Sequence, residues 1–250
     1  MKDISVIMPA RNEAHGIGAA LASVLESAAL FLGVKPEVLH LDGSRVEVLV
    51  VNNRSSDRTR EIVELYARGH GVECFDCERL RAPCARNFGV RFARGHIYVF
   101  VDADTAIPAA GLQRVFQLVT QHDYEAGIFA LCGHEDTLNS RCWWGFWNLV
   151  RLLPLARAKA LPAFMFCTRT AFDRFGPFDE SVQIGEEWPI LAGLYRHNPR
   201  RLIYDRTLTA RTSNRRMTLQ HFGYAKTFFK YVWAVLHASG RNRYPDTFRD

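Results

Sequence analysis

Residues 96–105 have the sequence HIYVFVDADT, in which an apolar run ends at two acidic residues. Aromatic and β-branched side chains favour a strand from 96 to 101, and a continuous apolar run is typical of a strand covered on both faces. Asp102 and Asp104 follow where that strand ends. The sequence therefore predicts a buried strand with two carboxylates at its carboxyl end.

Similar apolar runs precede this strand and alternate with helical patterns. We expect strands at 4–8, 46–51 and 72–75, and a helix from about 16 to 32. Alternation of this kind predicts an α/β fold, with a mostly parallel sheet flanked by helices. The second half of the chain is less regular, with one further strand expected at 163–168.

The composition is that of a globular protein, with 48% hydrophobic and 23% charged residues. No linker interrupts the 250 residues, so we expect a single domain. The net charge of +6 favours an anionic partner, such as a nucleotide, a phospholipid surface or nucleic acid, without choosing among them. No apolar run is long enough for a signal peptide or a spanning helix, which leads us to expect a cytoplasmic protein or one on the cytoplasmic face of a membrane.

Polar residues gather after three of the expected strands, at 9–13, 52–57 and 102–105. Ligands of parallel sheets bind beyond the carboxyl ends of the strands, because loops there present polar groups without burying them unpaired. We therefore expect one site at this edge. Asp102 and Asp104 offer it hard oxygen ligands that suit Mg²⁺ or Mn²⁺. The alternative is that both acids only cap a turn.

Four segments, in one order along the chain, resemble motifs of the family 2 glycosyltransferases with the GT-A fold. They are SVIMPARNE (5–13), VVNNRSSDRT (50–59), ARNFGVRFARGHIYVFVDADT (85–105) and FGPFDESVQIGEEW (175–188). They are similar to the family's opening strand and turn, its VDDGSxDxT element, its ARNxG helix with the metal-binding DxD, and its GGFDE and GED segment. The resemblance implies an inverting, metal-assisted direct displacement that moves a sugar from a nucleotide diphosphate sugar, with a UDP-sugar favoured, to an acceptor hydroxyl.

Within a single GT-A domain, the resemblance implies a donor-binding half at 1–105 and an acceptor-binding half at 106–250. The implied donor-binding residues are Pro9, Ala10 and Glu13 along the nucleoside, Asn52 and Asn53 beside the base, Arg86 near the base or phosphates, and Asp102 beside the ribose. Asp102 and Asp104 would hold Mn²⁺ or Mg²⁺. A guanidinium can neutralise phosphate charge, and a cation can stabilise a departing diphosphate.

The chain departs from the family pattern after the second expected strand. Asn52 and Asn53 stand where the family usually has two aspartates, and Arg54 stands where it has glycine. An asparagine carbonyl can accept the N3 hydrogen of uracil, as an aspartate does, while its amide also offers donors. The identity of the base is therefore left open.

A second departure concerns the catalytic base, because Glu186 and Glu187 follow Gly185 where the family has an acidic pair ending in aspartate. Glu187 aligns with the aspartate that takes the acceptor's proton, and its extra methylene moves the carboxylate by about one bond length. We expect Glu187 to be the base, with Glu186 as the second candidate. Alternatively, the two acids only mark the solvated start of a helix.

Candidate acceptor-binding and diphosphate-binding residues lie in the second half of the chain. Trp188 either stacks on a sugar or packs into the core, and Asp179 belongs either to a turn or to the acceptor site. Arg215 and Arg216 resemble an SxRR element of some bacterial members and can close over the diphosphate. The alternative is that they are solvated surface arginines.

Residues 206–244 contain no acid and mix basic with aromatic side chains. This pattern predicts either packed C-terminal helices or a surface that lies on an anionic membrane and meets a lipid-linked acceptor. The aromatic stretch CWWGFWNLVRLL at 142–153 allows the same two interpretations.

Other functions fit the sequence less well. A sugar-phosphate nucleotidyltransferase is disfavoured because PARNEAHGIG at 9–18 has only two glycines where such enzymes have a glycine-rich loop. A non-catalytic relative that binds a nucleotide or a glycan is the main alternative, since Asn52, Asn53 and Arg54 alter the donor site. No nucleic-acid-binding module is recognisable, so we expect no nucleic-acid partner.

Overall fold

The computed structural model describes residues 2–155, 162–182, 184–215 and 223–236. It confirms the α/β fold, with an eight-stranded sheet in the order β3-β2-β1-β4-β7-β6-β8-β5. The strands are β1 (Ile4–Ala10), β2 (Val46–Asn52), β3 (Glu73–Asp76), β4 (Ile97–Val101), β5 (Thr105–Ala106), β6 (Ala126–Gly133), β7 (Phe164–Thr168) and β8 (Leu202–Thr212). The helices are α1 (Ile17–Leu32), α2 (Thr59–His70), α3 (Ala82–Val90), α4 (Gly111–Thr120), α5 (Leu138–Val150), α6 (Arg169–Phe175), α7 (Trp188–His197) and α9 (Gly223–Leu236).

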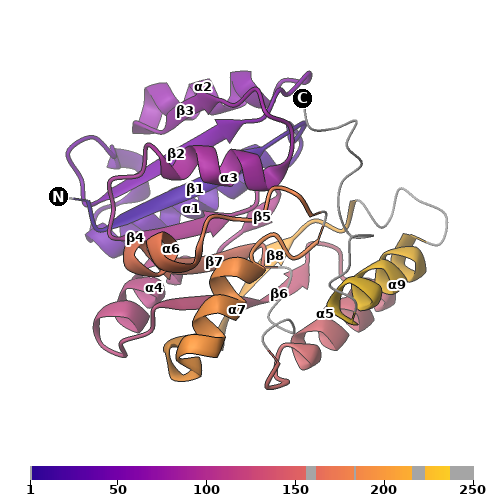
Figure 1. Ribbon diagram of the computed structural model, residues 1–250. Helices are drawn as coiled ribbons and strands as arrows, with labels where there is room; N and C mark the ends of the chain where they lie inside the picture. The colour runs from indigo at the N-terminus through magenta and orange to yellow at the C-terminus, as the bar shows by residue number, and fades with distance from the viewer. Residues whose placement is uncertain (1, 156–161, 183, 216–222, 237–250) are drawn as a thin grey trace.

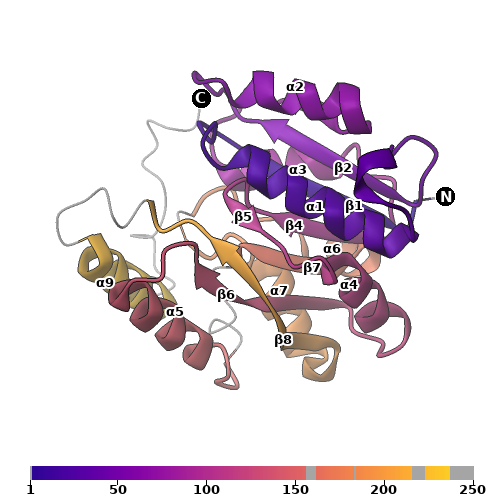
Figure 2. The same ribbon diagram turned by 180° about the vertical axis from the view of Figure 1, so that it is seen from behind.

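Helices cover both faces of the sheet. Figure 1 shows α3, α6 and α7 on one face, and Figure 2 shows α1 on the other. Because successive side chains of a strand point to opposite faces, Val6 and Met8 of β1 join a core with α1 and α4, whereas Ile7 joins a core with α6 and α7. This burial on both faces explains why the first strands are almost continuously apolar.

The first half of the chain forms the parallel part of the sheet. β1 pairs in parallel with β2 and β4, and β2 pairs in parallel with β3. The predicted strands at 4–8, 46–51, 72–75 and 96–101 are confirmed, with ends that differ by one or two residues. Their carboxyl ends therefore meet at one edge of the sheet.

Among the described residues, the rest of the chain contributes one strand that the sequence predicted and three that it did not. β7 confirms the strand expected at 163–168 and runs antiparallel to β4. Of the strands that were not predicted, β6 runs antiparallel to β7. β8 pairs in parallel with β6 and antiparallel with β5. The pairing shifts where Phe129 faces Asp205 and Ala130 faces Thr209, because β8 bulges between these positions.

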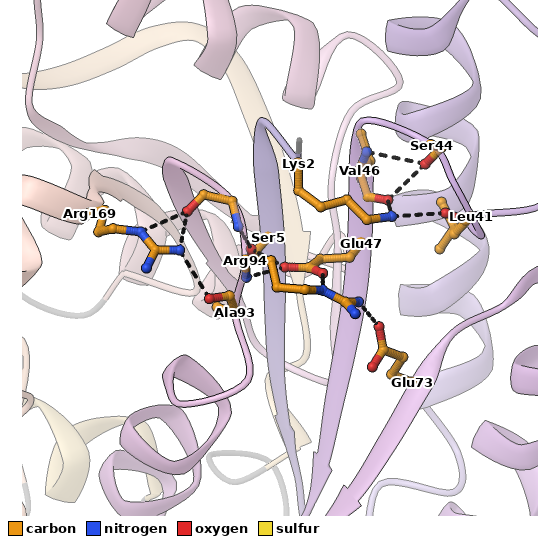
Figure 3. Close-up of polar contacts among 11 residues, drawn as sticks. Lys2, Ser5, Leu41, Ser44, Val46, Glu47, Glu73, Ala93, Arg94 and Arg169 are labelled. Carbon is orange, nitrogen blue, oxygen red and sulfur yellow. Dashed lines mark hydrogen bonds and ion pairs between the residues drawn. The ribbon is translucent and has the colours of Figure 1, made fainter.

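A polar cluster at the amino ends of the strands holds the parallel half together (Figure 3). Glu47 of β2 is only 2% exposed and accepts hydrogen bonds from the Ser5 hydroxyl at 2.5 Å and from the Arg94 backbone and Nε at 2.6 Å. Ser5 also accepts from the Gly95 N–H at 2.8 Å, and a Cβ on Gly95 would lie 2.7 Å from the Ser5 nitrogen. Ser5 and Arg94 thus satisfy the buried carboxylate of Glu47, and together with Gly95 these residues join β1, β2 and the turn before β4.

Candidate functional site

A cavity of about 700 Å³ opens at the carboxyl ends of the parallel strands. Its lining includes residues from the loops after β1, β2 and β4, from α3, and from the turn before α7. The lining residues include Pro9, Ala10, Glu13, Asn53, Arg86, Asp102, Asp104, Trp143, Trp144, Phe178, Glu186, Glu187, Thr212, Lys226 and Tyr231. The polar segments that the sequence analysis assigned to one site therefore do meet.

Arg86 on α3 is the central charged group of this cavity. Its side chain is buried, with Nη2 lying 2.6 Å from Asp102 Oδ1 and Nη1 lying 2.9 Å from Glu186 Oε1. The guanidinium also lies over the ring of Phe178, 5.5 Å from its centroid. Burial alone would lower the pKa of Arg86, but the carboxylates of Asp102 and Glu186 raise it above its ordinary value. The residue therefore remains a fixed cation in the wall of the cavity.

Asp102 and Asp104 form a turn directly after β4. The Asp102 N–H donates to the Ala163 carbonyl at 3.0 Å, and the Thr105 N–H donates to the Asp102 carbonyl at 3.0 Å. The hydroxyls of Thr105 and Thr212 each donate a long hydrogen bond of 3.5 Å to Asp104 Oδ1. Both aspartates thus line the cavity, and hydrogen bonds with Ala163 and with Thr212 of β8 hold their turn in place.

Two carboxylates are a suitable but partial set of ligands for Mg²⁺ or Mn²⁺. Among the described residues, no group of three or more His, Cys, Asp or Glu side chains is arranged to hold a metal ion. Hard divalent ions commonly take one or two carboxylates and complete their shell with water and phosphate oxygens. Asp102 and Asp104 therefore fit a metal that binds together with a diphosphate.

Glu187 stands at the N-terminal end of α7 and is 3% exposed, although it lines the cavity. The turn before it depends on Gly185, which has a φ of +84° and whose Cβ would lie 2.4 Å from the Trp188 ring. A helix N-terminus favours a negative charge, so the position suits a carboxylate. The local sequence thus turns sharply and presents one acid at the cavity wall.

A buried arginine lies near Glu187 and was not found from the sequence. Arg151 is 1% exposed at the end of α5, and its Nη1 donates to Asn148 Oδ1 at 2.8 Å. Burial lowers the pKa of Arg151 to about 10, while Tyr204 and the charge of Glu187 act in the opposite direction. The only signal in the sequence was a single charged residue inside an apolar stretch, which does not show what it contacts.

The two asparagines after β2 use their amides within the protein. Asn53 donates to the carbonyls of Cys77 at 3.2 Å and Arg79 at 2.6 Å, and its Oδ1 accepts from the Arg81 N–H at 2.9 Å. Asn52 donates to Asp76 at 2.8 Å, and it is absent from the cavity lining. Asn53 therefore holds neighbouring backbone in place, whereas Asn52 binds a side-chain carboxylate, and recognition of a base by Asn53 would require an exchange of partners.

The remaining predicted residues lie around the cavity. Arg215 pairs with Glu13 at 2.9 Å beside the loop after β1, whereas Arg216 lies outside the described residues. Asp179 accepts from the Ser181 N–H and hydroxyl at 2.9 and 2.6 Å, which favours the turn interpretation. Asp179, Trp188 and Arg215 are not among the lining residues, so their assigned contacts with substrate stay predictions.

The family of the chain follows from a match that spans most of these elements. The model of the family described as "Glycosyl transferase family 2" matches residues 5–181. The chain belongs to glycosyl transferase family 2.

Among its relatives, Haloferax volcanii glycosyltransferase AglE is 32% identical over 113 residues, which cover 44% of this chain and 33% of AglE. The minor teichoic acid biosynthesis protein GgaB of Bacillus subtilis is 24% identical over 131 residues, covering 52% of this chain and 13% of GgaB. The chain thus spans a third or less of these relatives.

Two solved structures share the fold. The mannosyltransferase PcManGT of Pyrobaculum calidifontis, in complex with GDP-Man and Mn²⁺, superposes with a TM-score of 0.64 at 22% identity, covering 98% of this chain and 66% of that one. S. aureus TarS 1-349 in complex with UDP-GlcNAc gives a TM-score of 0.62 at 19% identity, covering 94% and 65%. These likenesses confirm the GT-A fold. Among the described residues, no helix is both long and apolar enough to span a bilayer.

Proposed function

We propose that this family 2 chain is an inverting glycosyltransferase that moves a sugar from a nucleotide diphosphate sugar to an acceptor hydroxyl. The observation that carries the proposal is the arrangement around Arg86, which joins Asp102 at 2.6 Å and Glu186 at 2.9 Å in the wall of a cavity that Asp104 and Glu187 also line. This arrangement combines a fixed cation, two candidate metal ligands and a candidate base in one polar cavity. Each of these groups has a role in a reaction that transfers a sugar to a hydroxyl and expels a diphosphate.

Arg86, Asp102 and Asp104 bind the diphosphate end of the donor in this proposal. Mn²⁺ or Mg²⁺ held by the two aspartates would neutralise the negative charge of the leaving nucleoside diphosphate. Arg86 is protonated and buried, so its charge acts in a medium that screens it less than water does. When a phosphate approaches, the guanidinium can share its hydrogen bonds between the phosphate and its present carboxylate partners.

Glu187 is the base in this proposal, because it lines the cavity at the position where the resembled family has its catalytic aspartate, and Glu186 is the ion-pair partner of Arg86. The Glu187 carboxylate takes the proton of the acceptor hydroxyl while the acceptor oxygen bonds to the anomeric carbon. The bond from that carbon to the phosphate oxygen breaks at the same time, and its electron pair leaves with the nucleoside diphosphate. One displacement of this kind inverts the anomeric configuration.

The donor is proposed to be a UDP-sugar, bound along Pro9, Ala10 and Glu13. Support comes from the UDP-GlcNAc bound by TarS, whereas PcManGT was solved with GDP-Man, so the fold accommodates either base. The engagement of Asn53 by Arg81 limits its direct role in base recognition. A panel of nucleotide sugars therefore distinguishes the bases better than the asparagines do.

The test combines binding with turnover. Thermal unfolding of the chain is measured with UDP-sugars and GDP-sugars, with and without Mn²⁺, because a ligand that binds only the folded state raises the melting temperature. Donors that shift the melting temperature are then tested for release of nucleoside diphosphate, first with water as the acceptor. Metal-dependent binding together with slow hydrolysis supports a transferase. Binding without hydrolysis would instead favour the non-catalytic relative, and hydrolysis that Glu187→Gln leaves unchanged would remove Glu187 as the base.

A further inference from the structure

Exposed apolar side chains concentrate on one part of the molecule. Of the thirteen large hydrophobic residues that are exposed among the described residues, eight lie on α5, on the segment that follows it, and on α9. We call these eight the α5–α9 ridge. They are Leu138, Phe146, Leu149, Leu152, Leu153, Leu155, Phe229 and Trp233. Single exposed hydrophobic residues are ordinary, but such a concentration marks a surface that binds something.

The ridge is continuous across the two helices, which lie side by side in both views (Figures 1 and 2). The ring centroids of Phe146 and Phe228 are 5.0 Å apart, and those of Phe228 and Phe229 are 5.8 Å apart. Phe146 and Leu149 share one face of α5 by their spacing, and Phe229 and Trp233 share one face of α9. The exposed apolar side chains of α5 and α9 therefore lie on either side of the contact between the two helices.

The opposite side of the same helix pair faces the candidate site. Trp143 and Trp144 of α5 and Tyr231 of α9 line the cavity, and the rings of Trp143 and Tyr231 lie 6.0 Å apart. Edge-to-face aromatic contacts thus fix α5 and α9 to each other as one wall of the cavity. Whatever covers the ridge lies next to the cavity.

The charge of this surface points to one kind of partner. Neither Leu138–Leu155 nor Gly223–Leu236 contains an acidic residue, while α9 carries Lys226 and Lys230. Leucine, phenylalanine and tryptophan combined with lysine, without acids, are typical of helices that lie in a membrane interface. A second copy of the chain would bring the same positive charge against this surface, which disfavours self-association.

We propose that the α5–α9 ridge rests on a lipid bilayer with anionic headgroups. The ridge side chains enter the boundary between headgroups and acyl chains, and the acid-free, basic sequence of the two helices suits anionic headgroups. The cavity wall formed by α5 and α9 then stands at the membrane surface, where an acceptor carried by a lipid can enter from the side. Binding to the bilayer does not depend on the proposed sugar transfer, so an experiment can contradict either proposal without contradicting the other.

The test is sedimentation of the 250-residue chain with vesicles of phosphatidylcholine alone or mixed with phosphatidylglycerol. The protein is expected to sediment with the mixed vesicles and to be released by salt. Phe229→Ser combined with Trp233→Ser removes side chains that are 71% and 46% exposed, and it should weaken binding by at least about tenfold. Leu65→Ser is the matched control, because Leu65 is 62% exposed on α2 and lies far from the ridge.

Two results would overturn the proposal. The first is no sedimentation with the mixed vesicles, and the second is equal binding by the double variant and the Leu65→Ser control. Leu138→Ser, at a side chain that is 76% exposed, provides a second variant if the double variant does not fold. A dimer in solution that the double variant abolishes would assign the ridge to a second copy of the chain instead. Melting temperatures of all variants, measured without vesicles, control for stability.

Discussion

Arg86 and Glu186 form an ion pair of 2.9 Å between residues that are a hundred positions apart in the chain. The pair distinguishes two neighbouring acids that the sequence alone could not separate. Glu186 balances the buried Arg86, whereas Glu187 stands at the start of α7 and its charge acts on the buried Arg151. The two glutamates should therefore respond differently to the same substitution.

Glu187→Gln should lower the turnover number by about 10² to 10⁴-fold, which is the usual contribution of a general base. Donor affinity should stay within about twofold of the original, because the amide preserves the shape of the side chain. Glu186→Gln should instead weaken donor binding through Arg86 and leave more of the turnover. Steady-state kinetics together with the donor dissociation constant separate the two effects. A Glu187→Gln variant with normal turnover would remove this residue from the mechanism.

Arg86→Met should lower the free energy of unfolding by about 3 kcal/mol, because it leaves the carboxylates of Asp102 and Glu186 without their buried partner. Urea unfolding at neutral pH measures this change. The control is Arg58→Met, which breaks a pair with Glu61 in which both side chains are largely exposed. That variant should change the stability by less than about 0.5 kcal/mol. Similar losses for both variants would contradict a special role for the buried cation.

Asp104→Asn should weaken the Mn²⁺-dependent part of UDP binding by at least about tenfold, because an amide oxygen is a poorer ligand than a carboxylate. The thermal shift produced by UDP is compared with and without Mn²⁺ in both proteins. Asp136→Asn is a suitable control, since Asp136 is exposed and pairs only with Arg141 among the described contacts. An unchanged Mn²⁺ response in Asp104→Asn would argue that the metal binds elsewhere.

Asp205 should make the free energy of unfolding depend on pH in the acid range. Burial alone would raise its pKa, but hydrogen bonds from Thr207 and the guanidinium of Arg114 lower the pKa below its ordinary value. A carboxyl with a lowered folded pKa stabilises the protein above its unfolded pKa of about 3.9, and this contribution is lost as the pH falls through the folded pKa. Asp205→Asn should therefore cost stability at pH about 7 and much less at pH about 3.

Urea unfolding of both proteins at the two pH values measures this difference. Asparagine can still accept from Thr207, so the variant isolates the charge of Asp205 from the geometry of the bulge in β8. A difference between the two proteins that stays constant with pH would mean that the charge contributes nothing.

The parallel half of the fold was predictable because each of its strands is an apolar run that ends in polar residues. β6 was missed because AGIFALCG is a short apolar run with alanine and glycine, which local patterns do not separate from a helix. β8 was missed because LIYDRTLTART is mostly polar and carries a bulge, so its strand character depends on pairing with β6. Both strands owe their conformation to partners far away in the sequence.

The candidate site was predictable to a similar extent. Motif order identified Arg86, Asp102, Asp104 and Glu187 as neighbours of one cavity, because the ends of parallel strands converge. The partner of each side chain was not predictable. Nothing in the spacing indicates that Asn53 would bind the backbone of residues 77–81.

The cluster around Glu47 lies at the opposite ends of the strands from the cavity. Hydrogen bonds of Glu47 hold β1 and β2 in register at the amino ends of these strands. The pairing of β1 with β2 therefore depends less on the loops at their carboxyl ends. Substitutions at 9–13 or 52–57 should therefore disturb the pairing of β1 with β2 less than substitution of Glu47 would. Donor preference can then diverge on a common scaffold, and the resemblance implies changes of this kind at Asn52, Asn53 and Arg54.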